Sequence, residues 1–148
     1  MDDDYGRSVV LDSAFEAVVG EAGRAIREEG LQVIARVDVR DRFWRDLGYD
    51  FRQYLVLEVW SPELALRALR HDLEAGTVLP ATFAIYEVTD GRTAVVLREP
   101  FAPIADDPAW RGRFPDLAAI ADEERRHIAR VFERMRRAVG REISSPAA

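Results

Sequence analysis

The sequence predicts a single α+β domain, in which helices cover a mainly antiparallel, twisted sheet. Apolar residues repeat with helical spacing in some segments and alternate with polar residues in others, giving the order β-α-β-α-β-α-β-β-α. The last two strands are joined by a short turn, as antiparallel neighbours are. The 148 residues, 48% of them hydrophobic, fit one domain with its own core. We expect it to span residues 5–141, between a disordered acidic tail (1–4) and a second disordered tail (142–148).

The first strand and helix are predicted from local signals. Residues 5–11 are a short β-prone run, and Ser13 with Glu16 matches a capping box, which satisfies free backbone donors at a helix start. Gly30 ends this helix. Two further glycines lie inside it in a Gly-x-x-Gly spacing, and since no strand precedes them as a dinucleotide-binding turn requires, we expect close-packing positions at Gly20 and Gly23.

The middle of the chain alternates between strands and short helices. Residues 31–39 alternate apolar with polar side chains, which predicts a strand with one face in the core. A short helix ends at Gly48, and residues 53–60 form the next strand. The run Ser61-Pro62-Glu63 is a strong helix start, because Ser caps, Pro needs no amide donor and Glu suits the positive end of the helix dipole.

The C-terminal part predicts a hairpin and a long helix. Residues 81–88 and 92–99 flank Thr89-Asp90-Gly91, and Asp-Gly favours a tight antiparallel turn. A proline-rich connection then leads to a helix over residues 116–139. It carries one apolar stripe, broad enough to cover a sheet face or to pair with a second copy. The stripe consists of Leu117, Ile120, Ala121, Ile128, Val131, Phe132, Met135 and Val139.

Composition excludes several chemistries. All 21 basic residues are Arg and cysteine is absent, which rules out a lysine Schiff base, the usual phosphate loop and cysteine-based catalysis or metal binding. No Gly-x-Ser-x-Gly elbow occurs. The net charge of −6 argues against nucleic acid and anionic membranes as partners. Without a signal-like or membrane-spanning segment, we expect a cytoplasmic protein, and we predict no cofactor and no metal.

Three sets of polar residues have both a structural and a functional interpretation. Glu124-x-x-His127 has metal-binding spacing on a helix, but its second half is missing, so a surface Glu–His pair is favoured. Residues 125–141 hold seven Arg and one acid, which suits phosphate contact or, as we favour, the helix dipole. Paired carboxylates on neighbouring strands are a third set, and an enzyme of unknown reaction would use Glu58, Glu87 and Arg98.

Four segments together resemble the domain of unknown function 302 (DUF302) family. They are Gly30–Val39, Ser61–Leu69, Val78–Pro80 and Ile85–Glu87, within a similarity that extends from about residue 9 to residue 139. The resemblance implies a TATA-binding-protein-like β-α-β-sheet-α arrangement, a dimer, and no established activity. Many relatives carry cysteine at the positions of Trp60 and Ala81, so a thiol role cannot operate here. If the two positions meet, a large Trp60 facing a small Ala81 fills the space of two thiols.

These observations favour a homodimeric small-ligand-binding or accessory module without catalysis. Aromatic residues near strand ends, including Tyr54, are candidates to line an apolar pocket. The binding residues that we predict are Trp60, Ser61, Pro80 and Tyr86, with backbone donors at the helix N-terminus near Ser61 holding a small anion. The alternatives are the carboxylate and arginine enzyme, and contact with nucleic acid or an acidic protein through Arg126, Arg130, Arg134 and Arg137.

Overall fold

A six-stranded antiparallel sheet with the order β1-β2-β6-β5-β4-β3 forms the centre of the molecule. The computed structural model describes residues 2–3 and 5–139. The strands are β1 (Asp2–Asp3), β2 (Gly6–Leu11), β3 (Gln32–Asp38), β4 (Tyr54–Trp60), β5 (Ala81–Thr89) and β6 (Arg92–Arg98). The α-helices are α1 (Phe15–Glu28), α2 (Val39–Leu47), α3 (Pro62–His71), α4 (Pro108–Arg113) and α5 (Pro115–Ala138), and two 3-10 turns are η1 (Leu73–Thr77) and η2 (Ile104–Asp106). The predicted α+β class, antiparallel sheet and long last helix are confirmed.

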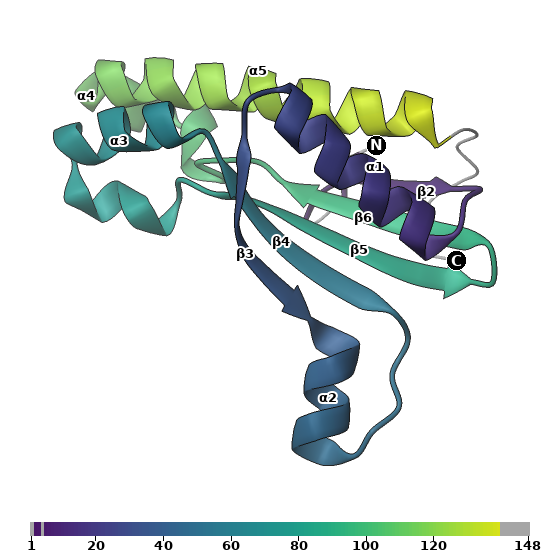
Figure 1. Ribbon diagram of the computed structural model, residues 1–148. Helices are drawn as coiled ribbons and strands as arrows, with labels where there is room; N and C mark the ends of the chain where they lie inside the picture. The colour runs from purple at the N-terminus through teal and green to yellow at the C-terminus, as the bar shows by residue number, and fades with distance from the viewer. Residues whose placement is uncertain (1, 4, 140–148) are drawn as a thin grey trace.

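The main core lies between one face of the sheet and the helices α1 and α5 (Figure 1). Strand residues alternate between this covered face and the opposite face, as the pleat requires. On β4, for example, Leu55, Leu57 and Val59 are buried and the residues between them are half-buried. The predicted stripe of α5 supplies Ile128, Val131, Phe132 and Met135 to this core.

A second apolar cluster forms where α3 meets the first half of α5. Its fully buried residues include Leu79, Phe101 and Ala121, and Trp60 and Trp110 pack against it from the edges. The proline-rich connection therefore has structure of its own, in η2 and α4, which the sequence did not predict. Among the described residues, no helix is both long enough and apolar enough to cross a membrane.

The ends of the elements confirm some local signals and contradict others. Ser61 caps α3 through its side chain, which accepts from the backbone N–H of Leu64, as predicted. The capping box at Ser13 is wrong. The N-cap of α1 is Ala14, and the carbonyl oxygen of Ser13 instead accepts a hydrogen bond from the buried hydroxyl of Thr93 at 2.8 Å. The helix therefore starts one residue later than predicted.

The N-terminal tail is also partly different from the prediction. Asp2 and Asp3 form a short strand, paired with Arg7 and Gly6 of β2, so the expectation of disorder is wrong for these two residues. Residues 1 and 4 and the predicted tail 142–148 lie outside the described residues.

The prediction that β3 has a buried face is wrong. All seven residues of this strand are exposed, because β3 is the last strand of the sheet among the described residues and the helices that cover the main core do not extend over it (Figure 1). Figure 1 shows β3 leading away from the helical layer and α2 projecting beyond it. We call residues 32–51 the arm. The alternating pattern of β3 is real, but the described chain provides nothing to cover its apolar side chains.

Candidate functional site

The sheet face opposite α1 and α5 carries a regular array of side chains from β4, β5 and β6. Because Leu55, Leu57, Phe83 and Ile85 belong to the core, the residues between them point to the open face. Strand register then arranges them in three rows. These are Tyr54–Tyr86–Ala94, Val56–Ala84–Val96 and Glu58–Thr82–Arg98.

A hollow of about 450 Å³ lies on this open face. The rings of Tyr54 and Tyr86 stack at one end, with centroids 5.1 Å apart and an angle of 6° between their planes. Ala84 and Val96 contribute small side chains between the tyrosines and the Arg98 row. The full lining consists of Tyr5, Tyr54, Thr82, Ala84, Tyr86, Val96 and Arg98. A mostly apolar hollow with a few polar groups is the usual character of a small-molecule site.

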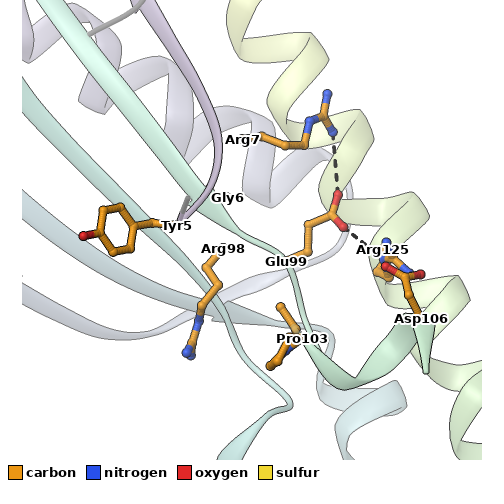
Figure 2. A pocket seen from close by; sticks show the side chains of 9 residues that line it. Tyr5, Gly6, Arg7, Arg98, Glu99, Pro103, Asp106 and Arg125 are labelled. Atoms are coloured by element: carbon orange, nitrogen blue, oxygen red, sulfur yellow. Dashed lines mark hydrogen bonds and ion pairs between the residues drawn. The ribbon is translucent and has the colours of Figure 1, made fainter. Parts of the chain in front are cut away.

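A second hollow of about 710 Å³ shares Tyr5 and Arg98 with the first. Figure 2 shows its ion pairs: Glu99 lies between Arg7 and Arg125, at 3.8 and 3.0 Å. Arg125 also contacts Asp106 at 2.9 Å. Arg98 points away from this group in the same view. Its guanidinium forms no hydrogen bond or ion pair with any described residue, so it is available to a ligand.

The structure does not bring the four predicted site residues together. Tyr86 lines the hollow. Trp60 and Pro80 lie one residue beyond the Val59–Ala81 pair, at the end of β4 and β5 that is farthest from Tyr86, and neither of them lines the hollow. Ser61 lies next to Trp60, at the start of α3. The hollow instead adds Arg98 and Thr82, which the sequence placed on strands but could not align.

The position at the N-terminus of α3 where we expected a small anion is occupied by a carboxyl group of the protein itself. The backbone N–H of Ser61 donates to Oε1 of Glu124 at 3.0 Å. Glu124 is fully buried, and its Oε2 has no hydrogen-bond partner among the described atoms. Burial raises the pKa of this carboxyl to about 7, although the bond from Ser61 acts in the opposite direction.

The interpretation of Glu124 and His127 as a surface pair is therefore wrong. Position 124 falls between Ile120 and Ile128 on the apolar stripe of α5, a spacing that could have indicated its burial from the sequence. His127 faces elsewhere, 3.5 Å from Glu29. No cluster of three or more candidate metal ligands occurs in the part of the chain that the structure describes.

The residues predicted for an enzyme based on carboxylates and arginine are brought together only in part. Glu58 and Arg98 flank Thr82 on the open face, and the hydroxyl of Thr82 donates to Glu58 at 2.8 Å. Glu87 follows the core residue Ile85 by two positions, so strand alternation points Glu87 to the covered face of the sheet and not to the open face. The three groups do not converge on one cleft.

Most of the arginines proposed to contact a partner are occupied within the chain. Arg130 and Arg134 both donate to Glu29, at 2.9 and 2.8 Å, and Arg137 lies 3.4 Å from Glu133. Arg126 is exposed and makes no such contact with a described residue. The two pairs to Glu29 join α5 to the end of α1, which gives this part of the arginine-rich segment a structural role.

Comparison with known proteins identifies the family. The family model of the domain of unknown function DUF302 matches residues 7–135. The chain belongs to the DUF302 family. No curated protein matches it. A crystal structure of an uncharacterised conserved DUF302 protein from Bacillus stearothermophilus has a TM-score of 0.70 and 23% sequence identity, covering 90% of this chain and 100% of the other. At that identity the similarity establishes the DUF302 fold.

The structure also tests the idea that Trp60 and Ala81, at the two positions where relatives carry cysteine, fill one shared space. Ala81 pairs with Val59 and belongs with it to the main core. Trp60 is the next residue along β4, so its side chain leaves the other face and packs against the second cluster. The two side chains therefore occupy different clusters, and the idea that Trp60 and Ala81 fill one shared space is not supported.

Proposed function

We propose that this DUF302 chain is a homodimeric module that binds a small molecule on the open face of its sheet. The observation that carries the ligand-binding part is the hollow between the Tyr54–Tyr86 stack and Arg98. It combines apolar walls with a cation that has no partner in the described chain, and both features favour retention of an organic ligand. The pairs around Glu99 show that the chain neutralises neighbouring arginines but not this one.

Filling the hollow tests the binding proposal. Replacing Ala84 by Leu adds a bulky side chain to its floor, and Ala119→Leu adds the same group to an exposed position of α5. Small aromatic and aliphatic compounds, both charged and neutral, are titrated while backbone amide shifts are recorded by NMR. We expect shifts around residues 82–86 and 96–98 that Ala84→Leu abolishes and Ala119→Leu preserves. If no compound shifts these residues, the open face is not a ligand site.

The arm supports the dimeric part of the proposal. Nine large hydrophobic side chains are exposed in the described chain, and six of them lie in the arm: Val33, Ile34, Val37, Trp44, Leu47 and Tyr49. Trp44 and Leu47 are 61% and 74% exposed. So many neighbouring apolar groups indicate an interaction surface, and an unprotected edge strand is a template for pairing with another strand.

The charges of the arm favour a second copy of the chain as its partner. The arm contains four Arg and four Asp and is neutral, so the net charge of −6 belongs to the rest of the chain. Two copies can therefore approach through their arms with little repulsion. A two-fold axis makes two β3 strands antiparallel, like every other pair in the sheet.

Measuring the molar mass in solution tests the dimer. Light scattering should give twice the 16.8 kDa of one chain. Val37→Arg, in β3, and Leu47→Glu, in α2, should each give the mass of one chain. Leu66→Arg changes an exposed apolar residue of α3 outside the arm, with an exposure between those of Val37 and Leu47, and should leave the dimer intact. A monomeric parent chain, or a dimer that survives both arm substitutions, contradicts this interface.

A further inference from the structure

We infer that the hollow on the open face binds an elongated amphipathic carboxylate, with its acid group on Arg98 and its apolar body directed toward Tyr54 and Tyr86. The inference rests on the proposed ligand-binding function and adds the chemical class of the ligand. It follows from the charge, the size and the row arrangement of the residues that line the hollow.

The position of the acid group follows from which of the nearby arginines already have a carboxylate partner. Arg7 and Arg125 already share Glu99. Arg98 is exposed at the boundary of both hollows, and its guanidinium has no partner among the described residues. A guanidinium presents parallel N–H donors that match the two oxygens of a carboxylate. An anion entering the hollow therefore binds Arg98.

A singly charged group suits the site better than a phosphate. Glu58 lies in the same row as Arg98, with only β5 between their strands, and strands are separated by about 4.8 Å. Its carboxylate is held in place by the hydroxyl of Thr82. A dianion on Arg98 would meet one unpaired cation and a fixed negative charge on the same face. A carboxylate brings one charge and forms one ion pair.

The length and the apolar character of the ligand follow from the rows. Tyr86 lies four residues from Thr82 on β5, roughly 13 Å along the strand. Ala84 and Val96 leave a low apolar floor between these ends, and the stacked tyrosines close the far end. Since Arg98 itself extends several ångströms, an acid with a short chain and a ring spans the remaining distance. Acetate is too small to reach both ends.

The test compares 4-phenylbutyrate with its neutral analogue 4-phenylbutanamide by calorimetry and NMR. Arg98→Ala is the site variant. Arg92→Ala is the matched control, because Arg92 is an exposed arginine on the same strand and the same face of the sheet, but it does not line the hollow. We expect the parent chain to bind the acid at least tenfold more tightly than the amide. Arg98→Ala should lose that preference, and Arg92→Ala should keep it.

The remaining outcomes separate the inference from the function on which it rests. If the acid and the amide bind equally and Arg98→Ala changes neither, the hollow binds apolar ligands and the carboxylate class is wrong. If neither compound shifts the amide signals of residues in the hollow, while other compounds of the wider panel do, the carboxylate class is again wrong and the binding function stands. If no compound shifts them, both are overturned. Equal melting temperatures for the two Arg variants exclude misfolding as the cause of a loss.

Discussion

The carboxyl group of Glu124 accepts a hydrogen bond from the backbone N–H of Ser61 at 3.0 Å, and this bond links the middle of α5 to the residue that caps the N-terminus of α3. Glu124 is fully buried, and its second oxygen has no partner among the described atoms. A charged carboxylate in that position costs free energy, because a single backbone donor replaces the hydration of the ion. The two helices therefore pack best when Glu124 is protonated.

This arrangement predicts a specific dependence of stability on pH. The pKa of Glu124 is raised from 4.5 to about 7 by burial, so the folded chain holds this proton over a range in which the unfolded chain releases it. The contribution of Glu124 to stability is then fully present below about pH 4.5 and is lost as the pH rises to about 7. The whole loss is on the order of 3 kcal/mol. Glu124→Gln should remove this dependence and be more stable than the parent chain above pH 7.

Urea denaturation of both chains at several pH values measures the difference. Glu123→Gln is the control, since Glu123 is the neighbouring carboxylate and its side chain is 42% exposed, 3.5 Å from Arg67. Because the charge of Glu123 also helps to raise the pKa of Glu124, this variant should keep the loss of stability with rising pH but complete it at a slightly lower pH than the parent chain. A Glu124→Gln profile parallel to the parent between pH 4.5 and 7.5 would show that the carboxyl does not titrate in this range.

The end of α1 depends on Glu29, whose side chain is only 7% exposed. Burial raises the pKa of Glu29, but hydrogen bonds from Arg130 and Arg134 outweigh it and hold the pKa below 4.5. Glu29→Ala should cost about 1–2 kcal/mol near pH 7, because two charge-assisted bonds are lost and the arginines are about half exposed.

The sign of the pH effect is opposite to that of Glu124. Stability from Glu29 is present above the unfolded pKa and is lost as the pH falls through the lower, folded pKa, so the difference between Glu29→Ala and the parent should shrink in acid. Thermal melts at pH 7 and pH 3 check this. Glu28→Ala, which removes a half-exposed neighbour, should cost less than 1 kcal/mol. Equal costs for the two substitutions would contradict the special role of Glu29.

Two glycines should respond in opposite directions to the same substitution. Gly6 has a φ of +144°, and a Cβ there would overlap the carbonyl oxygen of Leu97 on the paired strand. Gly6→Ala should therefore destabilise the chain by at least about 2 kcal/mol. Gly20 is exposed in α1, and a methyl group added there would have no neighbour within 4 Å, so close packing is not its role. Gly20→Ala should stabilise the chain by about 0.5–1 kcal/mol. Chemical denaturation measures both, and a loss of stability at Gly20 would contradict the open surroundings.

Local patterns predicted the elements well, because each depends on neighbours in sequence. The start of α3 at Ser61-Pro62 and the turn at Asp90-Gly91 are encoded within a few residues, and both occur as predicted. The helix α5 begins and ends within one residue of its predicted bounds. Of the four residues predicted for binding, Tyr86 is the one that lines the hollow on the open face.

The site as a whole could not be predicted in the same way. Arg98 and Glu58 flank Thr82 only because β4, β5 and β6 pair in one register, and no local signal specifies that register. The alternating pattern of residues 32–38 was correct for a strand, but its exposure depends on β3 being an edge. Ser13 does not cap α1, and its carbonyl accepts a hydrogen bond from Thr93, a residue distant in sequence that no local signal could pair with it.

The sequence by itself determined the type, order and approximate ends of the elements, the apolar stripe of α5 and the absence of lysine and cysteine chemistry. These depend on residue type and short spacing. Only the tertiary structure decided that Glu124 lies buried against Ser61, that the guanidinium of Arg98 is left without a partner among the described residues, and that the arm projects with its apolar side chains exposed. Burial and charge pairing are properties of groups brought together from distant parts of the chain, so they follow from strand register and helix packing.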